Sequence, residues 1–573
     1  MVTIEVNGRP VEAQPGEMLL STLRRVGVKV PTLCHLEGLN PSGACRMCVV
    51  EIEGQRGLIP SCAFPVTQPI KVQTHSSRAV LARKTIVELL LANHPDDCLY
   101  CVRNTNCQLQ GLAKELGVRQ RRFAGEKNRH FLDISGPSIM RDPGKCILCG
   151  KCVRVCEETQ GVGAIDFIGR GSRSKIGTAF DEGLNVSGCI NCGQCVVVCP
   201  TGALSEQSQL KEVIEALQDP RKLVVVQHAP AVSVTVGEAF GLPTGADTVG
   251  ALTAALRRLG FDRVFDTSFT ADLTIMEEAS ELVHRLQHGG VLPMMTSCSP
   301  GWIKFVETYY PDFLGHLSTC KSPQQMMGAI IKSYFAQREG VDPANIYSVS
   351  LMPCTAKKFE AGRPEMGRHG VADIDAVLTT RELIQLLHTY GLALSELPPE
   401  SSDTPFGERT TAGKLFGATG GVMEAALRTA HWMVAGRDLG ELTVAAVRGL
   451  EGVKQASVQV EGLTLNVAVV SGLANACRLL DQLRAGRNDL HFIEVMTCPG
   501  GCIAGGGQPL GTNLDAVRGR LQGLYELDRQ ETARTSHSNA SVKRLYDEFL
   551  GQPLGHQSHE LLHTHYIARE TLA

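Results

Sequence analysis

The chain has 573 residues, and its 56 lysines and arginines nearly balance 59 aspartates and glutamates, which gives a net charge of −3. This length predicts several domains, and the weak charge excludes an extended basic surface for nucleic acid or an anionic membrane. The chain starts directly with a strand pattern, without a signal segment, and has no apolar run near the ~18 residues that span a bilayer. We therefore expect a cytoplasmic protein with no nucleic-acid partner and no membrane insertion.

Cysteine is the unusual residue type, because 21 cysteines occur and most of them are clustered. In a secreted chain such a number would suggest disulfides, whereas C-x2-C spacings in a long intracellular chain favour metal ligation. The odd total also leaves at least one thiol unpaired. The sequence therefore favours bound metal over disulfides.

The first predicted domain covers residues 1–78. Alternation over residues 2–6, the type I′ turn signal Asn7-Gly8 and a helix over 19–26 predict a small β-rich fold. Four cysteines follow with the spacing C-x10-C-x2-C-x13-C: Cys34, Cys45, Cys48 and Cys62. This spacing favours a [2Fe–2S] site of plant-ferredoxin type, with a four-cysteine zinc site as the weaker alternative.

The second predicted domain covers residues 79–135 and opens with a helix over 80–95. Its candidate ligands follow the spacing H-x3-C-x2-C-x5-C: His94, Cys98, Cys101 and Cys107. The pattern alone suits zinc as well as iron. Between two iron–sulfur modules it favours a His-ligated [4Fe–4S] cluster, whose neutral imidazole should raise the reduction potential.

The third predicted domain, residues 136–209, contains an internal repeat of C-x2-C-x2-C-x3-C. This is the pattern of bacterial two-cluster ferredoxins, in which the fourth cysteine of each run ligates the other cluster. We therefore assign one [4Fe–4S] cluster to Cys146, Cys149, Cys152 and Cys199. The second is assigned to Cys156, Cys189, Cys192 and Cys195.

The fourth predicted domain covers residues 210–573 and alternates apolar strands with amphipathic helices. Strands are expected at 223–226 and 263–265, and helices at 249–259 and 273–287. Three cysteine motifs follow further strand-like runs: TSCSPGW at 296–302, MPCTAKKFE at 352–360 and TCPGGCIAGGGQP at 497–509. We expect these motifs at the carboxyl ends of strands, where open α/β sheets place ligands.

Together the three motifs resemble the active-site signatures of [FeFe]-hydrogenases, and the module order over the whole chain resembles the monomeric clostridial type. The resemblance implies an α/β and α+β multidomain protein: a β-grasp ferredoxin domain, a His/Cys cluster domain, a bacterial two-[4Fe–4S] ferredoxin domain and a large α/β catalytic domain. An H-cluster would lie between two lobes of the last, and residues 520–573 would correspond to the small subunit of some members. The H-cluster is a [4Fe–4S] cubane joined through one cysteine to a diiron centre with CO, CN⁻ and a dithiolate amine bridge.

The resemblance also implies roles for individual residues. Cys354, Cys498 and Cys502 would ligate the cubane, with Cys502 bridging to the diiron centre, and the Lys357 ammonium would hydrogen-bond a cyanide. The same pocket would be lined by Ala229, Pro230, Gln324, Met352 and Met496.

Two positions depart from the family pattern. Where members usually have two adjacent cysteines after Thr-Ser, this chain has Cys298-Ser299. By position Cys298 is the proton shuttle and Ser299 takes the fourth ligand position; the alternative is that Cys298 ligates and the shuttle is lost. Ala231 replaces a serine and would remove one hydrogen bond to a cyanide.

Three charged residues, Glu278, Glu281 and Arg285, lie at i, i+3 and i+7 of the expected helix. On its own this spacing is typical of a solvated helix face. Beside the resemblance it predicts a proton relay of Cys298, Glu278, Ser318, Glu281 and Arg285, in which a buried carboxylate with a raised pKa passes protons near neutral pH.

Some residues fall outside every motif. Cys320 and Cys477 are expected to be buried free thiols. A helix is expected over 538–550, and the histidines that follow it are expected to be exposed: His556, His559, His563 and His565.

The predicted function is reversible 2 H⁺ + 2 e⁻ ⇌ H₂, with electrons exchanged with ferredoxin or with flavin- and NAD-binding partner subunits. Maturation proteins are implied as further partners. The alternatives are an electron-transfer subunit of a NADH-oxidising complex, a hydrogen sensor and an assembly scaffold. The glycine-rich loop, the missing signalling domain and the relay argue against these in turn. The chain has no dinucleotide fingerprint, so any NAD chemistry belongs to a partner.

Overall fold

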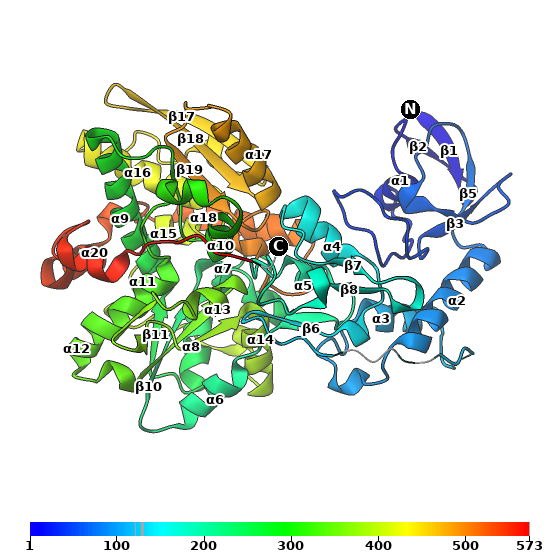
Figure 1. Ribbon diagram of the computed structural model, residues 1–573, viewed down its shortest axis with the longest axis horizontal. Helices are drawn as coiled ribbons and strands as arrows, with labels where there is room; N and C mark the ends of the chain where they lie inside the picture. The colour runs from blue at the N-terminus through cyan, green and yellow to red at the C-terminus, as the bar shows by residue number, and fades with distance from the viewer. Residues whose placement is uncertain (121, 126, 128–130, 572–573) are drawn as a thin grey trace.

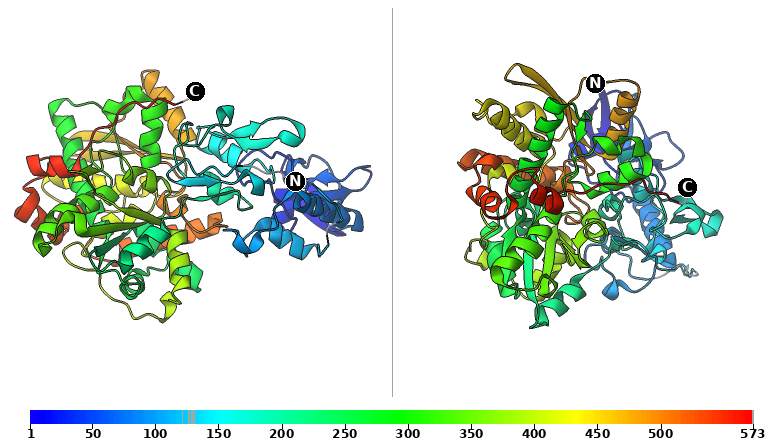
Figure 2. Two further views of the ribbon diagram at one scale, coloured as in Figure 1. Left: turned by 60° about the horizontal axis from the view of Figure 1, so that its bottom comes forward. Right: turned by 60° about the vertical axis from the view of Figure 1, so that its left-hand side comes forward.

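The computed structural model describes residues 1–120, 122–125, 127 and 131–571 (Figure 1). The N-terminal domain lies at one end of the long axis, and the C-terminal helix α20 (His556–Leu562) lies at the other. The small cysteine-rich segments connect them, as both further views agree (Figure 2). Within the described residues, no helix combines the length and the apolar character that a membrane span requires.

The N-terminal sheet has the strand order β2-β1-β5-β3-β4. Its strands are β1 (Val2–Val6), β2 (Arg9–Ala13), β3 (Val49–Ile52), β4 (Ile59–Pro60) and β5 (Lys71–Gln73). Asn7 and Gly8 both have positive φ, at 51° and 81°, as the predicted hairpin turn requires. Helix α1 (Leu19–Arg25) ends one residue before its expected end and buries Leu19, Leu20 and Leu23 against the sheet.

The predicted second helix is α2 (Ser77–Asn93), which begins where the Ser76 hydroxyl accepts a hydrogen bond from Ala79 N. Helix α3 (Gln108–Glu115) packs with it around Val87, Leu109 and Leu112. The same cluster includes Met47 of the N-terminal domain, so the first two cysteine-rich regions share a core.

The internal repeat of the sequence is also a repeat of structure. Helices α4 (Lys151–Arg154) and α5 (Gln194–Val198) each follow a left-handed glycine, Gly150 and Gly193, both with φ of 71°. A left-handed residue at this turn favours glycine, because a Cβ would be strained there. Two antiparallel sheets of two strands each complete the region: β6 (Ile139–Arg141) with β9 (Leu204–Glu206), and β7 (Asp166–Ile168) with β8 (Lys175–Gly177).

Two four-stranded sheets form the frame of the large domain. The first is parallel with the order β11-β10-β13-β16: β11 (Arg263–Asp266), β10 (Leu223–His228), β13 (Ile346–Met352) and β16 (Ala376–Thr379). The second has the order β12-β19-β18-β17, in which only β17 is antiparallel: β12 (Met294–Met295), β19 (Phe492–Met496), β18 (Leu463–Ser471) and β17 (Val453–Val460). The apolar run at 223–226 is typical of a parallel strand that is buried on both faces, and β10 is such a strand.

Helix α9 (Thr267–His288) is the central helix of the large domain. It begins six residues before the expected start, because Asp266 accepts a hydrogen bond from Ser268 N at 2.8 Å and caps it. It packs against α11 (Pro323–Ile330) and α16 (Gly421–Ala435), which buries most of its length. Its glutamates therefore lie inside the domain rather than on a solvated face.

Shorter elements complete the large domain. The helices are α6 (Leu210–Gln218), α7 (Pro230–Ser233), α8 (Val249–Arg258), α10 (Pro300–Tyr309), α12 (Ala336–Glu339), α13 (Ala356–Ala361), α14 (Thr380–Thr389), α15 (Thr411–Leu415) and α17 (Leu473–Arg484), and a small hairpin comprises β14 (Gly367–Arg368) and β15 (Val371–Ala372).

The C-terminal part contains α18 (Leu514–Gln530), α19 (Ala540–Leu545) and α20. The helix expected over 538–550 is shorter, because a π-helical turn over Tyr546–Leu550 replaces its second half. The expectation of exposed histidines is wrong for His563, which is buried, whereas His556, His559 and His565 are exposed. Burial of an imidazole in contact with α9 was not visible in the sequence pattern.

Candidate active site

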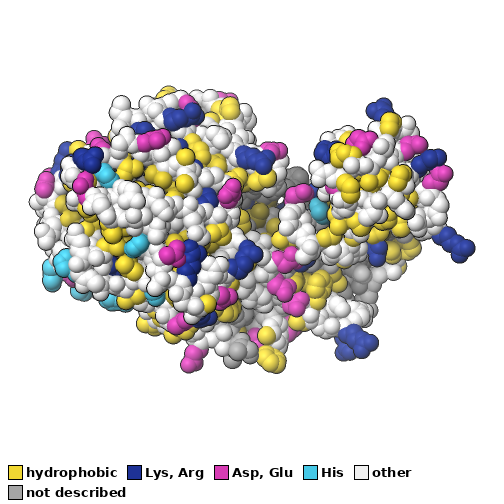
Figure 3. All heavy atoms as spheres, turned by 90° about the horizontal axis from the view of Figure 1, so that it is seen from above, with side chains coloured by type: hydrophobic (Ala, Val, Ile, Leu, Met, Phe, Trp, Pro, Cys, Tyr) yellow, Lys and Arg dark blue, Asp and Glu magenta, His cyan; other side chains and the backbone are white. Residues whose placement is uncertain are grey.

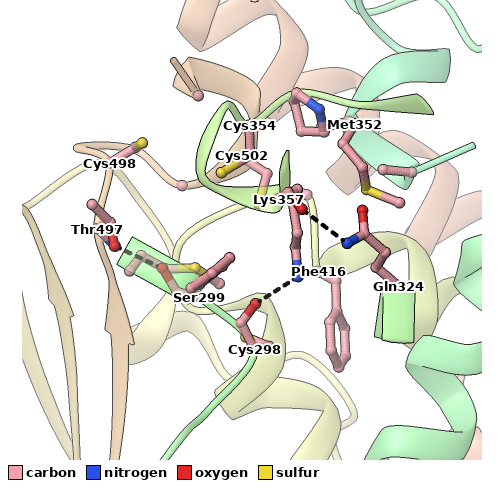
Figure 4. Close-up of a pocket in the computed structure, with 18 of the residues that line it drawn as sticks. Cys298, Ser299, Gln324, Met352, Cys354, Lys357, Phe416, Thr497, Cys498 and Cys502 are labelled. Carbon is pink, nitrogen blue, oxygen red and sulfur yellow. Dashed lines mark hydrogen bonds between the residues drawn. The ribbon is translucent and has the colours of Figure 1, made fainter. Parts of the chain in front are cut away.

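A buried cavity of about 80 Å³ lies where the carboxyl ends of strands from the two sheets meet (Figure 4). The segments after β10 and β13 line it from one sheet, and those after β12 and β19 line it from the other. Its lining includes eleven of the residues predicted from the sequence: Ala229, Pro230, Cys298, Ser299, Gln324, Met352, Cys354, Lys357, Met496, Cys498 and Cys502.

The glycine-rich loop after β19 is confined by backbone on two sides. A Cβ on Gly505 would overlap the carbonyl oxygen of Pro353, and one on Gly506 would overlap that of Cys192. The Gln194 side chain also donates from Nε2 to the Ala504 carbonyl oxygen at 3.0 Å. The loop therefore fits closely between the end of β13 and the two-cluster region, and it does so because these positions have no side chain.

Three thiols converge on the cavity from this loop and from β13: Cys354, Cys498 and Cys502. Burial, together with the neighbouring Cys354 thiolate, raises the pKa of Cys502 to about 12. Such thiols give up their protons when a metal binds, because the thiolate is the ligand.

The volume of the cavity shows whether this site has room for a large inorganic group. Protein interiors leave few voids larger than a water molecule, and one water needs only about 10–15 Å³ of such volume. The buried Gln324 Oε1 at the lining has no hydrogen-bond partner within the protein. A cavity of this volume, three converging thiols and an unpaired acceptor fit an H-cluster.

Cys298 and Ser299 point to different neighbours. The Ser299 hydroxyl lies 2.7 Å from Thr497 Oγ1, beside Cys498, and accepts from Thr497 N at 3.4 Å. Burial raises the pKa of the Cys298 thiol well above its usual value, and the Glu278 carboxylate adds to this. Figure 4 accordingly shows Ser299 on the Thr497 side and Cys298 below Lys357.

Lys357 is the cation at the cavity. Its Nζ donates to Glu360 Oε2 at 2.8 Å and to the Cys298 carbonyl oxygen at 3.2 Å. Glu360 also accepts from Ser322 Oγ at 2.9 Å and from Gln324 Nε2 at 3.0 Å. A buried ammonium requires such a counter-charge, and its remaining N–H can donate to an anionic ligand.

The predicted relay residues lie behind the cavity, on α9 and the loop beside it. Glu278 is 1 % exposed. Burial raises its pKa to about 8, with a further contribution from the Glu281 charge. Ser318 Oγ donates to Glu281 Oε2 at 2.9 Å, and Arg285 Nη2 donates to Glu281 Oε1 at 2.6 Å. The structure thus brings these four residues together and excludes the solvated-face interpretation.

Two smaller cavities of about 30 Å³ occur in the two-cluster region. One is lined by Cys146, Cys149, Cys152 and Cys199, and the other by Cys156, Cys189, Cys192 and Cys195. This is the crossed grouping that the repeat predicts. Cys192 lines the second of these cavities and also the central cavity, which the sequence did not indicate.

The remaining candidate ligands lie toward the N-terminus. Cys34 is hydrogen-bonded to Cys45, and Cys48 to Cys62, so these four thiols face one another in pairs. All 21 cysteines are free. Cys320 is buried as expected, whereas Cys477 is only half-buried.

His94 has the arrangement of a ligating imidazole. It is buried, its Nδ1 lies 3.0 Å from the Pro95 carbonyl oxygen, and its Nε2 has no partner within the protein. A backbone carbonyl at one ring nitrogen commonly orients a metal-ligating histidine. Among its predicted co-ligands Cys98 is exposed, and Cys101 and Cys107 are half-buried, so this group lies close to the surface.

Other residues at or beside the cavity were not predicted as site residues, although Thr497 and Glu360 lie within the cysteine motifs. Thr497 is the partner of Ser299, and Phe416 and Thr267 line the apolar side. Glu360 could have been identified, because it follows Lys357 by three positions on one helix face of α13.

Sequence profiles of five families match successive parts of the chain. They are described as a 2Fe-2S iron-sulfur cluster binding domain (1–77), the NADH-ubiquinone oxidoreductase-G iron-sulfur binding region (83–122) and a 4Fe-4S dicluster domain (145–203). The iron only hydrogenase large subunit, C-terminal domain, matches residues 222–506, and the iron hydrogenase small subunit matches 514–569.

Two curated relatives are similar over their full length. The NADP-reducing hydrogenase subunit HndD of Solidesulfovibrio fructosivorans is 46% identical, with all of both chains covered. Iron hydrogenase 1 of Clostridium pasteurianum is 38% identical, covering 99% of this chain and all of that protein. A solved [FeFe]-hydrogenase from Chlamydomonas reinhardtii is 43% identical and covers 63% of this chain and 99% of its own, with a TM-score of 0.58.

The same conclusion follows from the thiol-lined cavity, from the cluster-binding regions ahead of it and from the full-length relatives. The chain is a mixed α/β multidomain protein of iron–sulfur domains and a hydrogenase domain, and it belongs to the iron-only, or [FeFe], hydrogenase family, whose reaction is the production and oxidation of H₂ with electrons relayed by iron–sulfur clusters.

Proposed function

We propose that this chain interconverts H₂ with protons and electrons at an H-cluster held in the central cavity by Cys354, Cys498, Cys502 and Ser299. The observation that carries this proposal is the convergence of three strand-end cysteine motifs, from two different sheets, on one buried cavity. When bound, the diiron part of the H-cluster supplies the site at which protons and electrons combine. The protein supplies ligands, hydrogen bonds, a dry cavity and a proton path.

The residues around the cavity hold and orient the group. Lys357, fixed by Glu360, donates to an anionic ligand, and its own position is maintained by the Cys298 carbonyl. Met352, Met496 and Phe416 present apolar surface that excludes water. A low-dielectric surrounding strengthens the ammonium's interaction with charge inside the cavity.

Protons pass between the cavity and the surface through side chains of α9 and of the loops beside it. Cys298 exchanges a proton with Glu278, whose pKa of about 8 suits transfer near neutral pH. Ser318 and Glu281 continue the path to Arg285, which is hydrogen-bonded to Glu281. Ser299 and Cys298 thus have separate duties: Ser299 at the cubane and Cys298 at the proton path.

Electrons reach the cavity through the two-cluster region, because Cys192 lines both cavities. We infer one [2Fe–2S] and three accessory [4Fe–4S] clusters on the ligands assigned from the sequence. The exposed Cys98 makes the His94 group a surface contact for a redox partner. Likeness to a subunit named for an NADP-reducing hydrogenase favours a dinucleotide-linked partner subunit over free ferredoxin.

The proposed function also requires a reducing compartment and proteins that assemble the H-cluster. Free thiols throughout the chain favour a reducing compartment, so we propose a cytoplasmic location. Maturation proteins are needed as partners, because CO and CN⁻ ligands have no source within this chain.

Infrared spectroscopy of anaerobically matured protein tests the proposal. Bands of metal-bound CO and CN⁻ that shift under H₂ are expected, and Cys502→Ser should lose them while the accessory clusters remain visible by EPR. Cys477→Ser, at a thiol outside every motif, is the matched control. Competently matured protein without such bands would contradict an H-cluster in this cavity.

A further inference from the structure

The C-terminal segment brings a histidine to the proposed relay from outside α9. Cys320 and His563 form an isolated antiparallel bridge. On its two sides Thr564 N donates to the Thr319 carbonyl oxygen at 2.8 Å, and Lys321 N donates to that of Leu562 at 2.7 Å. These backbone bonds fix the His563 ring beside the loop that carries Ser318.

One hydroxyl joins this histidine to the relay. Thr319 Oγ1 lies 2.8 Å from His563 Nδ1 and donates to Glu281 Oε2 at 3.3 Å. Because a hydroxyl both donates and accepts, Thr319 can receive a proton from the imidazole and deliver its own to the carboxylate. Glu281 is also the acceptor for Ser318, so the two paths meet at one group.

The other ring nitrogen of His563 faces a carboxylate. Glu277 Oε2 lies 3.1 Å from His563 Nε2. Burial raises the pKa of Glu277, but donors including His563, Ser558 and Tyr546 outweigh it, so the net pKa lies below its usual value. An ionised Glu277 accepts a hydrogen bond from Nε2–H, which orients the ring so that Nδ1 faces Thr319.

Further titratable groups surround this pair. The Cys320 thiol lies 4.0 Å from Glu281 Oε2, and burial raises its pKa well above the usual value, so it stays neutral. The His559 ring stacks on His563 with 4.7 Å between centroids, and His565 follows at 6.4 Å from His559. His559 and His565 are exposed, and Figure 3 shows histidines gathered at the left-hand end of the molecule, where Figure 1 places α20.

Arg285 alone is a poor terminus for a proton path. A guanidinium has a pKa above about 12 and does not release its proton near neutral pH. The Arg285 side chain is also engaged by Glu281 and by the carbonyl oxygens of Leu317 and Val291, at 2.8 and 3.1 Å. Imidazole is the side chain that changes charge near neutral pH.

We propose that His563 is a second proton-exchange group of this enzyme, connected to Glu281 through the Thr319 hydroxyl. In H₂ production the Nδ1–H bond of the imidazolium breaks and its proton passes to Thr319 Oγ1, while the proton of that hydroxyl passes to Glu281 Oε2. H₂ oxidation runs the same transfers in reverse. His559 and His565 exchange protons with solvent beside it. The inference rests on the proposed relay and adds a branch to it.

Three variants test the branch: Thr319→Val, His563→Gln and the two combined. H₂ production and oxidation are measured between about pH 5.5 and 8.5, which spans the usual histidine pKa of about 6.5. Each variant should be slower in both directions, and its pH profile should differ from that of the native protein. The combined variant should be no slower than either single one, since both interrupt one route. Thr319→Ser, which keeps the hydroxyl, should restore the rate, and His556→Gln, at the exposed start of α20, is the matched control.

The same variants in an Arg285→Gln background separate two routes from one. With parallel routes, the combined loss should reach on the order of 10²-fold, as for removal of a positioned proton-transfer group. The branch would be overturned if Thr319→Val and His563→Gln had the rates and pH profiles of the native protein, and if adding either change to Arg285→Gln caused no further loss. If Glu278→Gln is inactive while these variants are unaffected, only the branch fails; full activity in Glu278→Gln would refute the relay itself.

Discussion

Adjacent glutamates on one helix show how local partners decide the protonation of a buried carboxyl. Glu277 and Glu278 are both buried on α9. Burial raises the pKa of each, but Glu277 has the donors His563, Ser558 and Tyr546, and its net pKa is lowered. Glu278 instead faces the charge of Glu281, and its pKa is raised to about 8. Glu277 is therefore a fixed anion, and Glu278 can exchange a proton.

Glu278→Gln should abolish turnover, by about 10²-fold or more, because the amide cannot transfer the proton. Infrared and EPR signals of the bound clusters should be unchanged, and the exposed Glu441→Gln is the matched control. In the native protein, H₂ production should fall and H₂ oxidation should rise as the pH passes about 8, because the acid donates and its anion accepts. Full activity in Glu278→Gln would exclude it from the path.

The same residue makes a prediction about stability. Folding raises the pKa of Glu278 from 4.5 to about 8. The contribution of this carboxyl to the free energy of unfolding is therefore fully present below pH 4.5 and is lost as the pH rises through about 8. Glu278→Gln should therefore raise the melting temperature relative to the native protein at pH 8 and above, and not at pH 5. An equal effect at both pH values would contradict the raised pKa.

Ser299 is the second residue whose role can be measured. Alkoxide oxygen is a harder ligand for iron than thiolate, so Ser299→Cys should make the cubane more resistant to chelators and shift its reduction potential. Ser299→Ala should lower its iron content. EPR redox titration and iron analysis after anaerobic reconstitution measure both. If Ser299→Ala binds iron as tightly as the native chain while Cys298→Ala does not, Cys298 is the ligand.

At the scale of elements, the glycine-rich loop determines how the two-cluster region meets the catalytic domain. Its backbone lies against the carbonyl oxygens of Pro353 and Cys192, which belong to different parts of the chain. Thr355 Oγ1 also donates to the Asn191 carbonyl oxygen at 2.7 Å across the same boundary. The close approach puts Cys192 at the lining of the central cavity.

Gly506→Ala tests this contact. Its Cβ would overlap the Cys192 carbonyl oxygen, and overpacking of this kind costs roughly 1–3 kcal/mol. We expect a lower free energy of unfolding, measured by denaturant titration, together with slower electron transfer to the cavity. Gly440→Ala, where a Cβ meets nothing within 4 Å, should change neither. Equal stability of the two variants would show that the loop does not pack as described.

At the scale of the whole molecule, the cluster-binding regions follow one another from the N-terminal end to the catalytic domain (Figures 1 and 2). Both N-terminal cysteine groups meet the two-cluster region directly: Arg154 is hydrogen-bonded to the Cys34 carbonyl oxygen, and Cys107 Sγ lies 3.7 Å from the Pro200 carbonyl oxygen. Electrons from either group would therefore reach the cavity through the two-cluster region. Cys195 lines the cavity next to the catalytic domain without lining the central one.

Cys195→Ser should therefore reduce turnover driven by the physiological partner more than turnover driven by a small artificial reductant. Loss of one [4Fe–4S] EPR signal with retention of the CO and CN⁻ infrared bands is the expected signature. Equal loss with both electron donors would mean that the cluster is required for the fold rather than for transfer.

The sequence by itself determined the cysteine groups, the repeat, the strand that precedes each catalytic motif and several helices, including α2 and α8. These features are local, because ligand spacing, apolar periodicity and turn residues depend on near neighbours in the chain. The start of α9 was missed by six residues, since Asp266 both ends β11 and caps α9, with no loop between the strand and the helix.

Only the tertiary structure decided which residues meet across long separations. It placed Cys192 at the lining of the central cavity and the Thr497 hydroxyl within hydrogen-bond distance of Ser299. It also connected His563 to Glu281 through the hydroxyl of Thr319. It also decided that the face of α9 carrying Glu278 is buried, because α11 and α16 cover that helix. The spacing of Glu278 and Glu281 along the helix is the same for a solvated face and for a buried proton path, so the sequence does not distinguish them. The pKa of such a carboxyl depends on its burial, and burial is decided by the packing of other helices against α9.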